Sequence, residues 1–239
     1  MQPPDGPPPP RDRDLSDQQR HTIGVYLAVQ AARAYETTPT LGDPSHNPLD
    51  PYGIPSSTLR EPRFKDCCIR EASVTYFPQY DERGIAGFES YPSLTKTELH
   101  RADITVSPAQ HGVWLSAAAR SDNCLVLAET TVTALSYHQL HRTANVHTRY
   151  LSPGLEPSPQ KLALVDRAIA TLPPGSTVVI AVGRHPTRER LAAALAAHAA
   201  RHPHVTVVRH APDRAFGDDW NATLRRLQPN KDLSKGLQR

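Results

Sequence analysis

Three acidic residues stand at positions where a carboxylate could act in catalysis. Glu129 ends the apolar run "CLVLAE", and Asp218 and Asp219 open the segment "DDWNATLRRL". A carboxylate at the end of a buried strand can act as a general base or hold a divalent cation. Each position has a structural alternative that stays open. The letters "ETT" can cap the next helix, and acids favour a helix N-terminus in general.

A second group of candidates is basic and lies in the stretch "VVIAVGRHPTRERL". Arg184, His185 and Arg188 follow a strand-like run and begin a helix-like one, so they could bind phosphate at a helix N-terminus. The alternative is a helix face in contact with solvent. Trp220, beside the two aspartates, could form a stacking surface for a base or pack in the core.

The remaining reactive side chains form no recognisable site. The chain has 12 histidines and 3 cysteines, but no C-x-x-C pair and no converging set of ligands in the sequence. We place His138 and His141 on an exposed helix face and treat His210 as isolated. Neither a glycine-rich dinucleotide fingerprint nor a Walker-type loop is present.

Segment 122–228 predicts the scaffold that holds these residues, because strand-like and helix-like stretches alternate along it. Apolar runs at 124–129, 145–152, 177–182 and 205–211 read as strands, and helix-like stretches follow each of them. In the second helix Ser158 caps a stripe of apolar residues that recurs at helical spacing. Strands that alternate with helices predict an α/β domain whose parallel sheet has about four strands.

The residues before this domain follow a different sequence pattern. Segment 53–121 predicts a small antiparallel α+β region, with strands at 73–77, 84–88 and 111–116. Segment 15–52 predicts a helix and a proline-rich connector, which could dock a protein partner. Residues 1–14 predict a disordered proline-rich tail, and residues 229–239 a flexible one.

Composition narrows the function only a little. The net charge is +3 with neutral histidines, which permits contact with nucleic acid without requiring it. No run approaches the length of a membrane span, and no secretory signal is evident, so we expect no membrane partner. With so few cysteines, reduced thiols in a cytoplasmic protein are the expectation.

The order of the motifs resembles that of Toprim-like domains in plasmid and mobile-element proteins. The matching stretches are "LVLAETTVTALSYHQLH", "TVVIAVGRHPTRERLA" and "FGDDWNATL". The upstream stretches "VTYFPQYDERGIAGFES" and "HGVWLS" are similar to the domain that often precedes Toprim in such proteins. The resemblance implies a Rossmann-like fold, association with DNA, and a place in replication, primase-like synthesis or conjugative transfer.

The resemblance also implies roles for single residues. Glu129 matches the acid–base glutamate, while Asp219, Trp220 and Asn221 match a terminal D-W-N, with Asp218 where lysine is usual. Because each of these is matched by motif position alone, the roles are expectations. Asp218 and Asp219 are the weaker catalytic candidates, and Asn221 joins the expected nucleic-acid contacts.

The metal-binding motif departs from the family pattern. Gly183 and His185 stand where related domains carry two magnesium-binding aspartates, with Arg184 between them. Magnesium needs oxygen ligands, so we expect no metal and no other cofactor at this position. The sequence therefore predicts a nucleic-acid-associated protein with reduced catalysis.

Two alternatives remain open. One is an active magnesium-dependent phosphoryl-transfer enzyme, such as a primase, nuclease or topoisomerase, that uses Glu129 with Asp218 and Asp219 or with Asp166. The other is a non-catalytic interaction module that docks a partner through the region before Gly53. Whether the chain is an enzyme is left undecided by its sequence.

Overall fold

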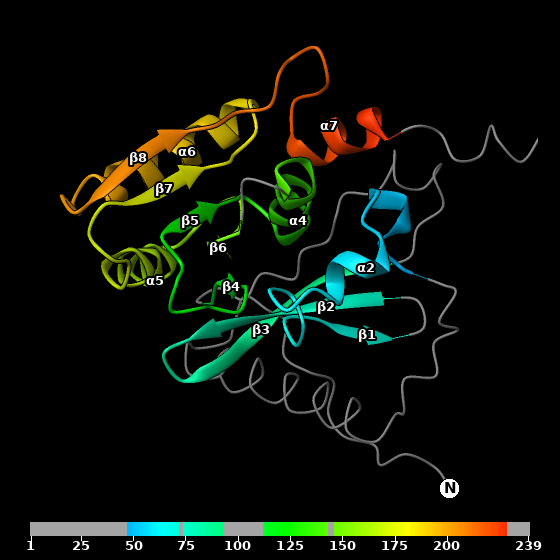
Figure 1. Ribbon diagram of the computed structural model, residues 1–239, viewed down its shortest axis with the longest axis horizontal. Helices are drawn as coiled ribbons and strands as arrows, with labels where there is room; N and C mark the ends of the chain where they lie inside the picture. Colours follow the sequence, from blue (N-terminus) through cyan, green and yellow to red (C-terminus); the bar gives the residue numbers. More distant parts are fainter. Residues whose placement is uncertain (1–46, 72–73, 93–111, 143–145, 229–239) are drawn as a thin grey trace, which may run out of the picture.

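The computed structural model describes residues 47–71, 74–92, 112–142 and 146–228. The predicted tails at 1–14 and 229–239 lie outside these residues, as does most of the predicted helix and connector at 15–52. The described chain is mixed α/β, with one mostly parallel sheet and one antiparallel sheet (Figure 1).

The larger sheet has five strands in the order β4-β6-β5-β7-β8. Its strands are β4 (Trp114–Leu115), β5 (Cys124–Leu127), β6 (Thr148–Ser152), β7 (Ser176–Ile180) and β8 (Val205–Arg209). The four predicted strands are all present and pair in parallel. The fifth, β4, comes from the stretch assigned to the upstream region and pairs antiparallel with β6.

Helices cover both faces of this sheet. They are α4 (Thr131–Leu140), α5 (Pro159–Ala170), α6 (Pro186–Ala199) and α7 (Trp220–Leu227). Leu125 and Leu127 pack with side chains of α5 and α6, whereas Val126 packs with side chains of α4 and α7. Alternate residues of β5 therefore enter different cores, which explains why its sequence is apolar throughout.

The smaller sheet is an antiparallel meander. It contains β1 (Ile69–Glu71), β2 (Val74–Asp81) and β3 (Gly84–Pro92), preceded by the short helices η2 (Asp50–Tyr52) and α2 (Ser56–Leu59). The predicted turn joins β2 to β3, and both strands are longer than the sequence pattern indicated. A bridge between Tyr80 and Val113 connects the meander to the β4 edge of the larger sheet, and Figure 1 shows the two side by side.

Helix α4 is more buried than its sequence indicated. His138, which was expected on an exposed face, is buried and hydrogen-bonds both the Tyr150 hydroxyl and the Glu61 carboxylate. The reason is tertiary, because Phe64 and Tyr150 pack their rings against this imidazole. In the described part of the chain, no helix has the length and apolar character to cross a membrane.

Candidate functional site

Glu129 and Asp219 meet across a single arginine. Glu129 follows β5 and is fully buried, and Asp219 precedes α7. The Arg188 guanidinium, from the first turns of α6, lies between them. Its Nε is 3.3 Å from Glu129 Oε1, and its Nη2 is 3.2 Å from Asp219 Oδ2. A cationic side chain of the protein thus occupies the space between two acids that could otherwise share a metal ion.

Burial makes Glu129 a weak acid. Desolvation raises the pKa of its carboxyl from 4.5 to about 7, and this effect outweighs the attraction of Arg188, which lowers the pKa. Neither carboxyl oxygen has a hydrogen-bond partner of good geometry in the described structure. The pKa of Glu129 is consequently close to neutral pH, as a general acid or base requires, although the side chain has no contact with solvent.

Gly183 is required by the close approach of another backbone. A Cβ at this position would lie 2.5 Å from the Asp218 carbonyl oxygen and 2.7 Å from Arg188 Cδ. The neighbouring Arg184 N–H donates to the same Asp218 oxygen at 2.9 Å. The segment before α7 is therefore pressed against the end of β7. With this packing, an aspartate side chain has no room at position 183.

Arg209 stabilises the same turn from the end of β8. Its guanidinium donates to the carbonyl oxygens of Ile180, Val182 and Gly183, the last at 3.0 Å. The Ile180 carbonyl also accepts from the His210 N–H at 3.1 Å, while the Val182 and Gly183 carbonyls follow the end of β7. The arginine thereby holds the chain extended up to Gly183. Sequence reasoning missed this role, because a terminal strand arginine shows no motif.

The acids before α7 have separate tasks. Asp219 Oδ1 accepts from the Ala222 N–H at 2.7 Å, so it is the N-cap of α7 while its other oxygen meets Arg188. Asp218 is exposed and contributes its backbone carbonyl. Glu129 does not cap α4, because Thr130 accepts from the Thr133 N–H instead.

The described residues do not fit a magnesium ion at this edge. They contain no group of three or more His, Cys, Asp or Glu side chains able to hold a metal. Asp166, considered as a replacement ligand, lies on α5 and pairs with His198 of α6 at 2.8 Å. Among the described residues at this edge, Glu129 and Asp219 come together, and the Arg188 guanidinium already lies between them.

The remaining predicted contacts fall in different places. Asn221 donates its amide to the Tyr52 carbonyl at 2.7 Å, linking α7 to the upstream segment. His185 is exposed and caps α6 through Nδ1, 3.4 Å from the Thr187 N–H. Arg184 and Trp220 line a cavity of about 630 Å³ beside this edge.

Several residues of that cavity were not singled out as candidates from the sequence. His210 follows β8 directly, His141 ends α4, and Arg214 and Phe216 lie in the loop between β8 and α7. The one available signal was the position of His210 after a parallel strand, where ligand sites tend to form.

Comparisons with known proteins gave few matches. No family model matches the sequence, and no curated protein matches it. A search of solved structures found the primase fragment of the bacteriophage T7 primase-helicase protein, with 13% identity and a TM-score of 0.43. That match covers 82% of this chain and 83% of the other. We therefore argue function from the side chains of this chain.

Proposed function

We propose that this chain is a Toprim-like, nucleic-acid-binding protein in which Arg188 replaces the catalytic metal. The motif order resembles that of plasmid and mobile-element Toprim proteins, and we place the chain in the same kind of DNA processing. The mostly parallel sheet with helices on both faces suits this assignment. So does the gathering of Glu129, Gly183 and Asp219 at one region.

The ion-pair bridge through Arg188 is the observation that carries the proposal. Magnesium is bound in proteins through carboxylate oxygens that the ion reaches directly. Here one guanidinium contacts both acids, and Glu129 is fully covered by protein. The arginine supplies the positive charge that keeps the two acids together. The same contact removes the coordination sites that metal-dependent phosphoryl transfer would use.

Contact with nucleic acid would occur outside this bridge. Arg184, His185 and Arg190 are exposed where β7 leads into α6. A helix N-terminus carries partial positive charge, and arginine matches the geometry of phosphate oxygens. By resemblance we take DNA as the partner. Such a surface predicts binding that weakens steeply as the salt concentration rises.

Titration with Mn²⁺ tests the metal-free site. Wild-type protein should not bind Mn²⁺ at this edge, whereas Arg188→Gln should gain affinity that increases with pH as Glu129 ionises. The double variant with Glu129→Gln is the matched control and should lose that gain. Mn²⁺ binding by the wild type that Glu129→Gln abolishes would overturn the proposal.

Titration with a short DNA strand at several salt concentrations tests the partner. Substitution of Arg184 and Arg190 by alanine should weaken binding and flatten its salt dependence, because each lost phosphate contact lowers the slope by about one. Arg226→Ala, an exposed arginine on α7, serves as the control. Absence of binding at low salt would refute the nucleic-acid assignment.

A second candidate function is supported by Glu129 alone. A fully buried carboxyl whose pKa is about 7 suits acid–base catalysis. The enzyme would be a magnesium-dependent phosphoryl transferase in which Arg188 swings away on substrate binding. Magnesium-dependent cleavage or synthesis that disappears in Glu129→Ala would favour this function over the first.

A further inference from the structure

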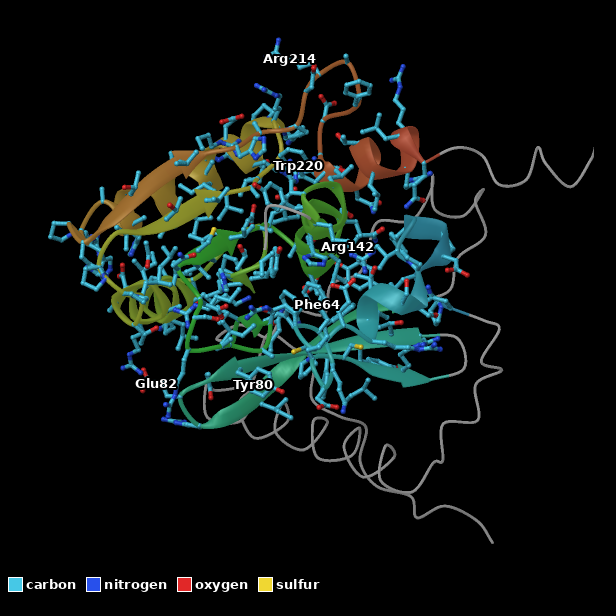
Figure 2. The ribbon with its side chains drawn as sticks, viewed as in Figure 1. Phe64, Tyr80, Glu82, Arg142, Arg214 and Trp220 are labelled. Atoms are coloured by element: carbon cyan, nitrogen blue, oxygen red, sulfur yellow. The ribbon has the colours of Figure 1, made fainter. Side chains whose placement is uncertain are left out.

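The cavity beside the Arg188 bridge is built from rings and cations. It has a volume of about 630 Å³ and lies between the end of α4, the loop after β8, and α7. The residues that give it chemical character are His141, Arg184, His210, Arg214, Phe216 and Trp220. Its size is within the range of small-molecule sites in proteins. Figure 2 shows Trp220 beneath the loop that carries Arg214.

The ring wall of the cavity is held in place by Tyr137. The Tyr137 hydroxyl and His210 Nδ1 are 2.9 Å apart, and the His141 ring stacks on Tyr137 with centroids 4.2 Å apart. His141 Nδ1 also donates to the Tyr137 carbonyl at 2.9 Å. Trp220 meets both imidazoles edge to face. The rings are therefore ordered before any ligand arrives, which lowers the entropic cost of binding.

Burial, followed by the nearby His141 and Arg209, lowers the pKa of His210. Its imidazole is accordingly neutral at physiological pH and presents a polar ring without a charge. A neutral ring of this kind can face a planar heterocycle without repelling it.

Two arginines supply positive charge at the same cavity. Arg184 is anchored by Nε, which donates to the Pro212 carbonyl at 2.6 Å, and its terminal nitrogens have no partner in the described structure. Arg214 forms no hydrogen bond or ion pair with the described residues. Asp213 is the single acid in the lining, and its side chain accepts from the Ala215 N–H within its own turn. The arginines thus remain available to an anion.

The lining of the cavity also includes exposed apolar side chains. Phe216 is 38% exposed and Leu227 is 49% exposed, although both are large hydrophobic side chains. Both line the cavity. An exposed aromatic ring beside ordered imidazoles offers a surface on which a flat ring can stack.

The geometry points to a nucleotide-binding pocket, in which the exposed Phe216 ring stacks on a base while Arg184 and Arg214 bind its phosphate. The ligand is a base-plus-phosphate unit, supplied either by a free nucleotide or by one residue of a single DNA strand. The inference rests on the proposed function in that both use Arg184. It adds roles for Arg214 and Phe216, in the loop after β8, that the sequence reasoning did not assign.

Calorimetric titration with dAMP, inorganic phosphate and a short 5′-phosphorylated oligodeoxyadenylate tests the pocket. Wild-type protein should bind dAMP more tightly than phosphate, because the base adds stacking. Phe216→Ala and Arg214→Ala should each weaken dAMP binding about tenfold. Val208→Ala and Arg226→Ala are the matched controls, because they remove an exposed apolar and an exposed basic side chain that do not line the cavity.

The titrations with dAMP and with the oligonucleotide distinguish the two sources of the ligand. Weaker oligonucleotide binding in Phe216→Ala would show that the pocket accepts a nucleotide of a strand, whereas dAMP binding without oligonucleotide binding would identify a free nucleotide and refute the proposed DNA partner. Oligonucleotide binding that Phe216→Ala and Arg214→Ala leave unchanged would refute the pocket and retain the proposed function. Failure of both ligands to bind, or equal losses in the control variants, would also overturn the inference.

Discussion

Replacement of Glu129 by glutamine should make the protein more stable at alkaline pH. The side chain is fully buried, and burial raises the pKa of its carboxyl from 4.5 to about 7 despite Arg188. Desolvation of the buried carboxylate outweighs the attraction of Arg188, so the charged form is costly, and a neutral amide of the same shape avoids that cost.

The size and pH range of the effect follow from linkage. Below about pH 4.5 the carboxyl is protonated in the folded and unfolded chains alike, so the substitution changes little. As pH rises towards 7, the unfolded chain releases this proton while the folded chain retains it, so wild-type stability falls. At about 1.4 kcal/mol per pKa unit, the full loss is about 3 kcal/mol above pH 7.

Urea unfolding at a series of pH values measures this directly. The free energy of unfolding of Glu129→Gln minus that of the wild type should rise from near zero at about pH 4 to about 3 kcal/mol at about pH 8. Glu82→Gln, at an exposed carboxyl, is the control and should stay within about 0.5 kcal/mol of wild type. A difference that does not change with pH would refute the account of Glu129.

Two further substitutions test the packing around the site. Gly183→Ala should lower the free energy of unfolding by about 1–3 kcal/mol, because its Cβ would lie 2.5 Å from the Asp218 carbonyl oxygen; thermal unfolding at the wild-type temperature would contradict this close approach. Asp219→Ala should cost about 1 kcal/mol or more in urea unfolding, because α7 loses its cap and Arg188 loses a partner. Asp218→Ala, which keeps the backbone contact, should cost less than about 0.5 kcal/mol, and equal losses at both positions would count against these assignments.

Gly183 and Arg188 explain each other through this packing. The missing side chain at Gly183 lets the segment before α7 approach, and Arg188 then reaches both acids. An aspartate introduced at Gly183 would push against the Asp218 carbonyl oxygen, so this substitution alone should not create a metal site. The substitution that opens the space between Glu129 and Asp219 is the removal of Arg188.

The strands and helices of the larger sheet were predictable because their signals are local. Apolar runs marked β5 and β7, and Ser158 marked the start of α5. In the smaller sheet, the residues of the turn between β2 and β3 predicted that turn in the same way. Each of these depends on residues close together in the chain. The placement of β4 was not predictable, since its partner β6 is distant in sequence and two residues carry almost no pattern.

For the candidate site, the sequence by itself determined which residues follow each strand, and therefore which side chains could meet. Only the tertiary structure decided what they do there. Arg188 was interpreted as a phosphate ligand and lies between two acids. His141, expected on an exposed helix face, and His210, treated as isolated, both contact Tyr137. The physical reason is that charge neutralisation and ring packing depend on distances of a few ångströms between separate elements. No spacing along the chain encodes those distances.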